Sequence, residues 1–246
     1  MPQISESRFT VHASWDDIPH LGEDQKRKIL ASTLPHLRKA RSSGMPGLGA
    51  GAIYPVDEEQ ILCEPFKIPQ YWPRAYGFDV GWKKTAAVWG ALDETSDIVY
   101  LYAEHYMGQA PPSNHASAIL ARGEWIPGAI DPAARGRSQR DGEQLIHDYK
   151  ELGLNLKPAN NAIHAGLDAV LDRLATGRLK VFSTCRNWRM EYRIYRRDEK
   201  GHIVKQYDHL MDATRYLVVD VRSLAMTEVR ASVVASNRTA DRTAGY

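Results

Sequence analysis

Cysteine is scarce in this chain, and long apolar runs are missing. The two cysteines among 246 residues, Cys63 and Cys185, are far apart and outside any C-x-x-C spacing, which argues against a disulfide scaffold or a zinc knuckle and favours a reducing compartment. No apolar stretch of about 18 residues and no signal-peptide core occurs, so neither a membrane span nor a secretory address is expected.

A strong excess of charge of one sign is also absent. Thirty-two Lys and Arg against 30 Asp and Glu give a net charge of +2, so any affinity for nucleic acid must come from local clusters of basic residues. The composition, 43% apolar and 25% charged, is ordinary for a soluble globular protein. The length predicts one substantial domain with an appendage.

Three regions differ in their patterns. Residues 1–72 combine short elements with turn chemistry, and their Gly-rich loop at 43–51 lacks the G-x-x-x-x-G-K-[ST] phosphate-binding pattern. Residues 73–225 show the regular apolar periodicity of a folded domain. Residues 226–246 are small and polar and are expected to form a flexible tail.

The middle region predicts a mixed sheet. Strand patterns at 74–80, 85–92 and 98–106 form an antiparallel meander. The apolar run at 128–130 follows a helix, so it is expected to lie parallel to an earlier strand. Helices are predicted at 113–121, 139–152, 163–176, 185–196 and 208–221. The fold class is therefore α/β, with a mixed five-stranded sheet flanked by helices.

Isolated aspartates stand at the ends of these elements. Asp79 ends the first strand and Asp131 follows the apolar run, while Asp208 and Asp212 lie one turn apart on the last helix. Carboxylates gathered in a cleft repel one another, and hard divalent cations offset that repulsion. Two such ions, about 3.5 to 4 Å apart, can activate a water and stabilise the departing oxygen of a phosphodiester. The pattern predicts a Mg²⁺ or Mn²⁺ site.

Each aspartate alone also fits a structural role, as a turn residue or, for Asp208, as a helix N-cap. Asp212 either binds metal directly or orients Arg215 from outside the ligand set. His209 is expected to be a helix-start residue rather than a ligand, because oxygen ligands suit Mg²⁺ better than imidazole does.

Basic residues form clusters that suit a phosphate backbone or, equally, a solvated helix face. Those in the helix at 185–196 recur at spacings of three and four, a second group follows Asp131, and a lysine pair follows Asp79. The candidate DNA-binding residues are Lys83, Lys84, Arg135, Arg137, Arg140, Arg186, Arg189 and Arg193. No base-reading motif is visible, so little sequence preference is expected.

Three segments contain the acids together with recognisable neighbours: Gly77–Trp82 with Thr85, Ile130–Ala133 leading to Ser138–Gly142, and Asp208–Tyr216. Together they resemble the C-terminal nuclease domain of the large terminase subunit of tailed double-stranded DNA phages, a ribonuclease H-like domain. Upstream, Ser14–Leu21 and Ile53–Val56 resemble the region where the terminase motor ATPase joins its nuclease. The resemblance covers most of residues 9–221.

The resemblance implies an endonuclease that cuts concatemeric viral DNA during packaging. Two divalent ions would be held by acids matching Asp79, Asp131 and the Asp208/Asp212 cluster. Many relatives carry two adjacent acids where this chain has Asp208-His209, so the distribution of ligands there is open. Residues 1–72 would be the trailing end of the motor and a linker. Because the Walker motifs are absent, the chain is expected to cut DNA without hydrolysing ATP.

The implied partners are double-stranded DNA, the motor ATPase domain of the full-length chain, the small terminase subunit and the portal ring, in the host cytoplasm and with no membrane. Three rivals stay open. Asp79-Val80-Gly81 with Thr85 also resembles the first phosphate loop of sugar kinases and actin, although no second phosphate loop is found. A non-catalytic docking module of a packaging motor and a resolvase or transposase of the same fold are the others.

Overall fold

The computed structural model describes residues 51–131, 144–160 and 162–228, together with 21–32 and short stretches at 3–5, 8–9, 15 and 42. The chain divides into two compact units, residues 1–57 with 193–204 and residues 58–192 with 205–246. The division between a motor remnant and a nuclease at residue 72 stays a prediction. No helix of the described residues is long and apolar enough to cross a membrane.

The first unit contains the following elements: β1 (Gln3–Ser5), β2 (Arg8–Phe9) and α1 (Glu23–Ser32). Residues 51–57 and 193–204 also belong to this unit and contact each other. Ala52 pairs with Arg196 in an antiparallel bridge, and the rings of Tyr54 and Tyr195 lie 5.5 Å apart. These contacts join two segments that are about 140 residues apart in the sequence.

The second unit holds the sheet and most of the helices. Its strands are β3 (Leu62–Cys63), β4 (Arg74–Asp79), β5 (Thr85–Asp93), β6 (Ile98–Met107), β7 (Gly128–Ile130), β8 (Leu156–Pro158) and β9 (Leu179–Phe182). Its helices are α3 (Glu58–Ile61), α4 (Pro112–Leu120), α5 (Gln144–Glu151), α6 (Ile163–Ala175) and α8 (His209–Leu224). Helix α7 (Arg186–Ile194) begins here, and its last two residues are assigned to the first unit.

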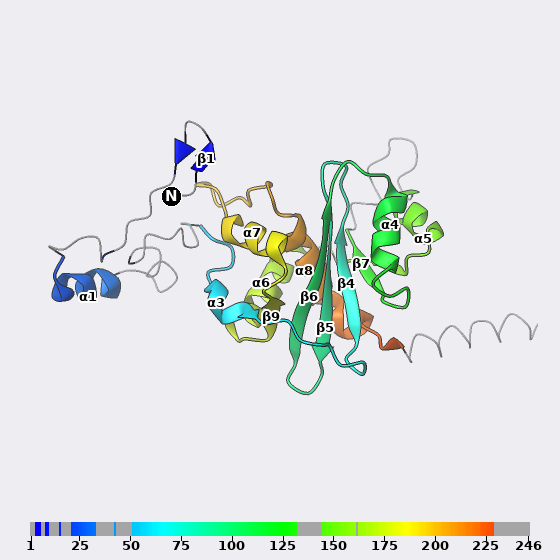
Figure 1. The fold of residues 1–246 in the computed structure, drawn as a ribbon, viewed down its shortest axis with the longest axis horizontal. Helices are drawn as coiled ribbons and strands as arrows, with labels where there is room; N and C mark the ends of the chain where they lie inside the picture. The colour runs from blue at the N-terminus through cyan, green and yellow to red at the C-terminus, as the bar shows by residue number, and fades with distance from the viewer. Residues whose placement is uncertain are drawn as a thin grey trace, which may run out of the picture. The chain divides into compact units, whose positions relative to one another are not determined.

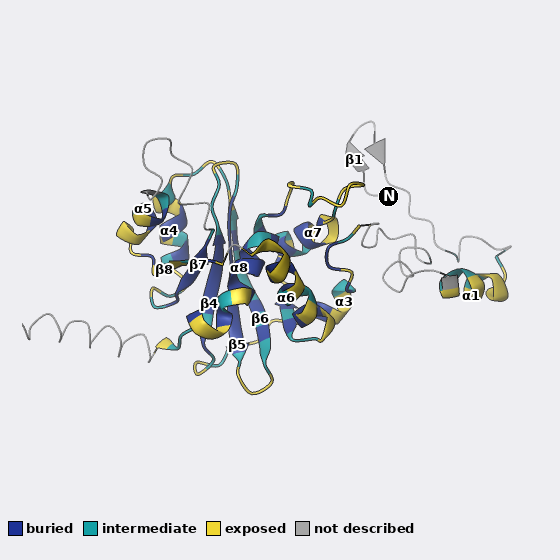
Figure 2. Cartoon of the chain, turned by 180° about the vertical axis from the view of Figure 1, so that it is seen from behind, coloured by how far each residue is buried: buried dark blue, intermediate teal, exposed yellow. Residues whose placement is uncertain are grey.

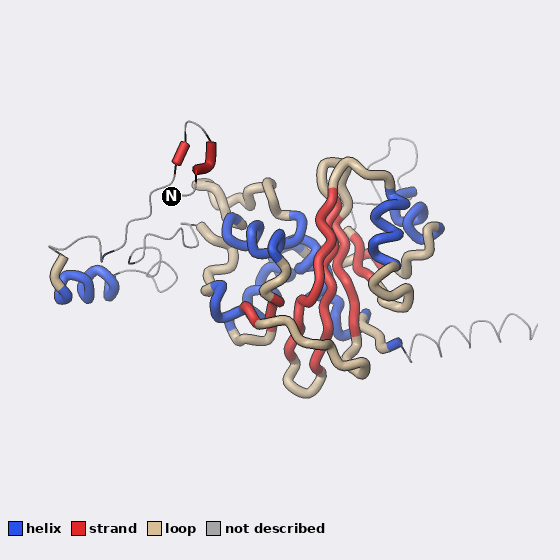
Figure 3. The backbone as a smooth tube through the Cα atoms, in the orientation of Figure 1, coloured by secondary structure: helices blue, strands red, loops and turns tan. Residues whose placement is uncertain are grey.

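The sheet has the strand order β3-β9-β6-β5-β4-β7-β8 (Figures 1 and 3). Strands β4, β5 and β6 form the antiparallel meander, while β7 pairs parallel with β4 and β8 parallel with β7. On the other side, β9 pairs parallel with β6 and β3 parallel with β9. The carboxyl ends of β4 and β7 therefore meet at one end of the sheet, where functional groups of open α/β sheets collect.

Helices cover both faces of the sheet, with α4 and α5 on one side and α6, α7 and α8 on the other (Figure 1). The central strand β5 is accordingly buried along almost its whole length (Figure 2). Side chains alternate along β4: Tyr76 and Phe78 join the core beneath α4 and α5, whereas Gly77 and Asp79 face α8. The strand thus presents its carboxylate on the face that α8 covers.

The predicted fold class is confirmed, and the meander strands end within one residue of the predicted bounds. The predicted number of strands is wrong, because the described residues form a seven-stranded sheet rather than a five-stranded one. The three strands without a predicted range, β3, β8 and β9, have two to four residues each, too few for alternation to show in the sequence. The helix predicted at 139–152 is described as Gln144–Glu151, and its earlier residues lie outside the described part.

A buried histidine pair joins the sheet to α4. Nε2 of His105 in β6 lies 2.9 Å from Nδ1 of His115 in α4, and both side chains are almost fully buried. Burial, with the neighbouring His115, lowers the pKa of His105 to about 4, and burial also lowers the pKa of His115. The pair therefore packs in its uncharged form.

We expect this pair to make stability depend on pH. The pKa of His105 is lower in the folded than in the unfolded state, so the unfolded state binds more protons between pH 6.5 and about 4, and stability falls as the pH falls through that window. The loss reaches about 3 kcal/mol at the acid end. Urea unfolding at several pH values should give a flatter profile for His105→Gln. In the exposed control His164→Gln, the free energy of unfolding should depend on pH as it does in the unsubstituted protein. An equal pH dependence in the unsubstituted protein and both variants would show that His105 does not cause it.

The closest approach between sheet and helix is at Gly77. A Cβ at this position would lie 1.8 Å from the carbonyl oxygen of Ala213 in α8, much closer than any real Cβ contact. Only a residue without a side chain lets the α8 backbone rest directly on β4. This contact sets the distance between Asp79 and the first turn of α8.

Gly77→Ala is predicted to lower the free energy of unfolding by at least about 2 kcal/mol, because the methyl group forces the helix and strand backbones apart. Urea unfolding followed by circular dichroism measures the loss. Gly22→Ala is the matched control, since nothing lies within 4 Å of a Cβ there. A Gly77→Ala protein as stable as this control would show that α8 shifts without cost.

Candidate metal centre

Two of the predicted acids come together at the carboxyl ends of β4 and β7. Phe78 is paired with Ile130 in the parallel ladder, and the backbone N–H of Asp131 donates to the Phe78 carbonyl at 3.0 Å. Asp79 and Asp131 are therefore the next residues on adjacent strands. The two acids therefore lie at corresponding ends of parallel strands, as the sequence pattern indicates.

The first turn of α8 brings the remaining acids to the same end of the sheet. His209, the first residue of the helix, places Nδ1 2.8 Å from Oδ2 of Asp79. Asp208 occupies the N-cap position, but its side chain makes no capping hydrogen bond and is 9% exposed. Asp212 lies one turn later and is 13% exposed. Asp208 is thus at the cap position without performing the capping role.

Cationic side chains hold the two α8 acids. The ammonium of Lys205, in the loop before α8, lies 3.1 Å from Oδ2 of Asp208 and 3.0 Å from Oδ2 of Asp212. The Arg215 guanidinium donates to the other oxygen of Asp212, Oδ1, at 3.1 Å. Arg215 is 3% exposed, and its stem packs against Gly166 of α6, where a Cβ would lie 2.7 Å from Cγ of Arg215. The expected pairing of Asp212 with Arg215 is present.

Electrostatics show that the acids of the three elements are close. Burial raises the pKa of Asp79, the hydrogen bond from His209 opposes this, and the Asp212 and Asp131 charges raise it further. Burial also raises the pKa of Tyr216, and Asp212, Asp131 and Asp79 add to that shift. The hydrogen bond with Asp79 is the main reason that the pKa of His209 is raised. Carboxylates from β4, β7 and α8 thus share one electrostatic environment.

The donor set suits a hard divalent cation, although the side chains are not arranged as ligands here. Among the residues that the structure describes, no group of three or more His, Cys, Asp or Glu side chains is placed to hold a metal ion. The acids are turned instead toward Lys205, His209 and Arg215. The position of the Lys205 ammonium between two carboxylates shows that this place accepts a positive charge.

Comparisons with known proteins agree with this geometry. The model of the terminase RNaseH-like domain family matches residues 76–220, which include all four predicted acids. The chain belongs to this terminase family. It is 32% identical over 222 residues to the terminase large subunit of Salmonella phage P22, which covers 86% of this chain and 44% of that protein. The chain thus spans about half the length of the curated relatives that it matches.

Solved structures give the same family and fold. The P22 large terminase nuclease domain superposes with a TM-score of 0.69 at 30% identity, covering 75% of this chain and 98% of that one. The large terminase nuclease of thermophilic phage G20c with bound magnesium has a TM-score of 0.52 at 13% identity, covering 70% and 98%. At that identity the G20c structure supports the fold alone. The ribonuclease H-like fold is therefore shown for this terminase domain.

Two glutamates, the partly buried Glu104 and the buried Glu191, support the helices around the candidate metal centre. Glu104 of β6 accepts hydrogen bonds from the backbone N–H groups of Asn187 and Trp188 at the start of α7. Glu191 of α7, fully buried, accepts from the Leu210 N–H at 2.6 Å and from the Tyr106 hydroxyl at 2.8 Å. Burial raises the pKa of Glu191. Each carboxylate satisfies donors at a helix N-terminus, so β6 positions α7 and α7 positions α8.

Glu191→Met keeps the side-chain volume but removes both acceptors. It is predicted to lower the free energy of unfolding by about 2 kcal/mol or more, because the Leu210 N–H and the Tyr106 hydroxyl lose their partner in the interior. Denaturant unfolding measures the effect. The exposed Glu94→Met serves as the control, and equal stability of the two variants would remove Glu191 from this supporting role.

The candidate DNA-binding residues have different surroundings. Lys83 is exposed, and the Lys84 ammonium lies 4.2 Å from the ring centroid of Tyr106. The guanidinium of Arg189 is bound by Glu58 at 2.6 Å and also donates to the Ser183 carbonyl. In α7, Arg186 and Arg193 are exposed. The second cluster, Arg135, Arg137 and Arg140, lies outside the described residues.

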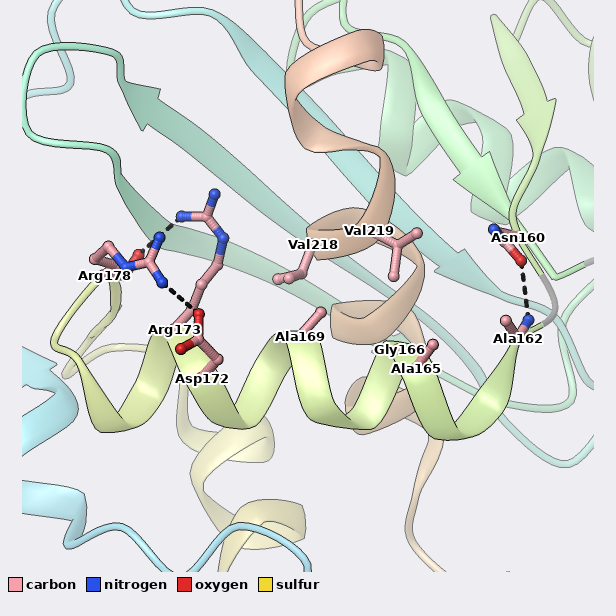
Figure 4. Close-up of a pocket in the computed structure, with 10 residues that line it drawn as sticks. All are labelled: Asn160, Ala162, Ala165, Gly166, Ala169, Asp172, Arg173, Arg178, Val218 and Val219. Carbon is pink, nitrogen blue, oxygen red and sulfur yellow. Dashed lines mark hydrogen bonds and ion pairs between the residues drawn. The ribbon is translucent and has the colours of Figure 1, made fainter.

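A pocket of about 330 Å³ lies away from the acids, between α6 and α8 (Figure 4). Small or apolar side chains of both helices line it, including Ala165, Ala169 and Val218, and none of the four predicted acids does. Arg173 and Arg178, at one end of the pocket, bind Asp97 of the β5–β6 turn at 3.0 and 2.9 Å. This pocket belongs to the packing of α6 on α8 rather than to the metal centre.

The sequence reading missed three residues of the site: Lys205, Glu191 and Tyr216. The position of Lys205, three residues before Asp208 and seven before Asp212, was an available signal. Glu191 and Tyr216 gave no such signal. The hydrogen bond of Glu191 to the start of α8 and the position of Tyr216 beside the acids depend on burial by segments that are distant in the sequence.

Proposed function

We propose that this terminase domain is a divalent-metal-dependent endonuclease that cleaves concatemeric viral double-stranded DNA during genome packaging, with little sequence preference. The observation that carries the proposal is the gathering of Asp79, Asp131 and the Asp208/Asp212 pair at one end of a ribonuclease H-like sheet. The family and the P22 nuclease domain support this reading. Carboxylate oxygens are the ligands that a hard divalent cation prefers, which supports the metal dependence.

Asp79, Asp131, Asp208 and Asp212 would hold the metal, with two Mg²⁺ or Mn²⁺ ions expected. The ions, when bound, supply an activated water and charge stabilisation for the departing oxygen of the phosphodiester. His209 orients the Asp79 carboxylate through its 2.8 Å hydrogen bond, and Arg215 fixes Asp212 through Oδ1. These contacts hold the acids in place before substrate arrives.

The loop after Asp79 is suited to meet a DNA backbone. Its conformation is held by the Gln109 N–H, which donates to the Trp82 carbonyl at 2.9 Å, and by the Thr85 hydroxyl, which donates to the Gly81 carbonyl at 3.0 Å. Lys83 and the 71%-exposed Trp82 project from this fixed backbone. An ammonium and an aromatic ring offer attraction to phosphate and contact with sugar or base.

The biological setting follows from the relatives, which are about twice as long as this chain. The proposed partners are a motor ATPase domain in the full-length chain, a small terminase subunit and the portal ring, acting in the host cytoplasm. Residues 1–72 would be the end of the motor and a linker. This chain, which has no Walker motif, would cut DNA without ATP.

Asp79→Asn is predicted to reduce plasmid nicking and linearisation in Mg²⁺ or Mn²⁺ by at least about a hundredfold, because one ligand charge is lost with little change of shape. Asp168→Asn, at an exposed position of α6, is the matched control and should cut like the unsubstituted protein. Circular dichroism checks the fold, and EDTA should abolish all cutting.

Other results would favour the rival readings. Absence of cutting by the folded protein in either metal, on plain and branched DNA, would favour a non-catalytic docking module. Preference for branched or end-specific DNA over plain duplex would favour a resolvase or transposase. Undiminished cutting by Asp79→Asn would refute the assignment of the metal centre.

A further inference from the structure

Lys205 is placed as a counter-cation within the proposed metal centre. Its ammonium lies 3.1 Å from Asp208 Oδ2 and 3.0 Å from Asp212 Oδ2, so it bridges two carboxylates from successive turns of the α8 N-terminus. Both carboxylates are largely buried, whereas the Lys205 side chain is 59% exposed. A partly exposed cation therefore contacts two largely buried carboxylates.

A divalent ion bound to the same two oxygens would repel the Lys205 ammonium. Mg²⁺ binds carboxylate oxygens at about 2.0 to 2.1 Å, closer than the ammonium lies here, so the two positive charges would compete for the same pair of acids. Without any cation the acids would repel each other across one helical turn. An ammonium offsets that repulsion with a single charge, and a divalent ion does so with two.

The two cations that bind Asp212 are placed differently. Arg215 is 3% exposed, is packed on α6 and binds Oδ1, so its contact is part of the fold. Lys205 takes Oδ2 from a loop in which Tyr207 has a φ of +55°, a conformation that a bulky side chain rarely adopts. The Lys205 contact can open without disturbing α8, whereas the Arg215 contact cannot.

We propose that Lys205 is a positioning residue that bridges Asp208 and Asp212 in the metal-free protein and is displaced by the divalent cation, so that it sets the metal affinity of the centre. The inference rests on the proposed function. It assigns Lys205 a role in metal loading that is separate from the chemistry of cleavage.

Calorimetric titration with Mn²⁺ alone tests the proposal without DNA. Lys205→Gln is expected to bind Mn²⁺ about fivefold more tightly than the unsubstituted protein, because two partly exposed ion pairs no longer have to be broken. Lys205→Arg should restore affinity to the unsubstituted level or below it. Lys157→Gln, at an exposed position of β8, is the control and should leave the affinity unchanged.

Thermal unfolding gives a second readout. In EDTA, Lys205→Gln should unfold at a lower temperature than the unsubstituted protein, since its acids are left unbalanced. Saturating Mn²⁺ should raise its unfolding temperature by more than it raises that of the unsubstituted protein. Lys205→Ala, expected to behave like Lys205→Gln, provides an independent variant if the glutamine protein does not fold.

The outcomes separate this inference from the proposed function. If the unsubstituted protein binds Mn²⁺ while Lys205→Gln and Lys205→Ala bind it equally or more weakly, that result would overturn the role of Lys205 and leave the metal centre standing. Absence of Mn²⁺ binding in every variant, Lys205→Gln included, would overturn both. Tighter Mn²⁺ binding by Lys205→Gln and Lys205→Ala, with no DNA cleavage by the unsubstituted protein, would sustain the role of Lys205 and count against the nuclease.

Discussion

The direct contact between the backbones of β4 and α8 is the constraint on which the remainder of the site depends. At Gly77 the strand lies against the Ala213 carbonyl with no side chain between them. That approach brings the first turn of α8 within hydrogen-bonding distance of the carboxylate two residues further along β4. A wider separation would leave the strand acids and the helix acids as unrelated surface groups, whatever their sequence spacing.

Two carboxylates that accept hydrogen bonds from helix N-termini also help to position α8. Glu104 fixes the start of α7, and Glu191 fixes the start of α8, which carries Asp208 and Asp212. Backbone N–H groups are among the hydrogen-bond donors to both carboxylates, and among the described residues neither glutamate is paired with a lysine at the candidate metal centre. The two glutamates maintain the scaffold, and the acids at the end of the sheet remain available for a cation.

The sequence predicts the parts of this fold that have long periodic patterns. The meander, the bounds of most helices to within three residues and the neighbouring positions of Asp79 and Asp131 follow from periodicity and from the parallel register. Strands β3, β8 and β9 are too short to show a period, and their pairing depends on tertiary contacts. Glu191 could not be assigned from spacing, because it acts through the backbone of a helix that begins 18 residues later. The ligand set itself remains a prediction.

Helix α8 is held at both ends, over a length of about 24 Å for its 16 residues. Its first turn is bound through Glu191, and in its last turn Arg222 binds Asp97, 2.8 Å away, in the turn at the opposite end of the meander. A helix bound at both ends does not slide easily along its axis. A displacement of the β5–β6 turn would instead tilt α8 about its contact with Gly77, and would thereby change the positions of Asp208 and Asp212 at the other end of the helix.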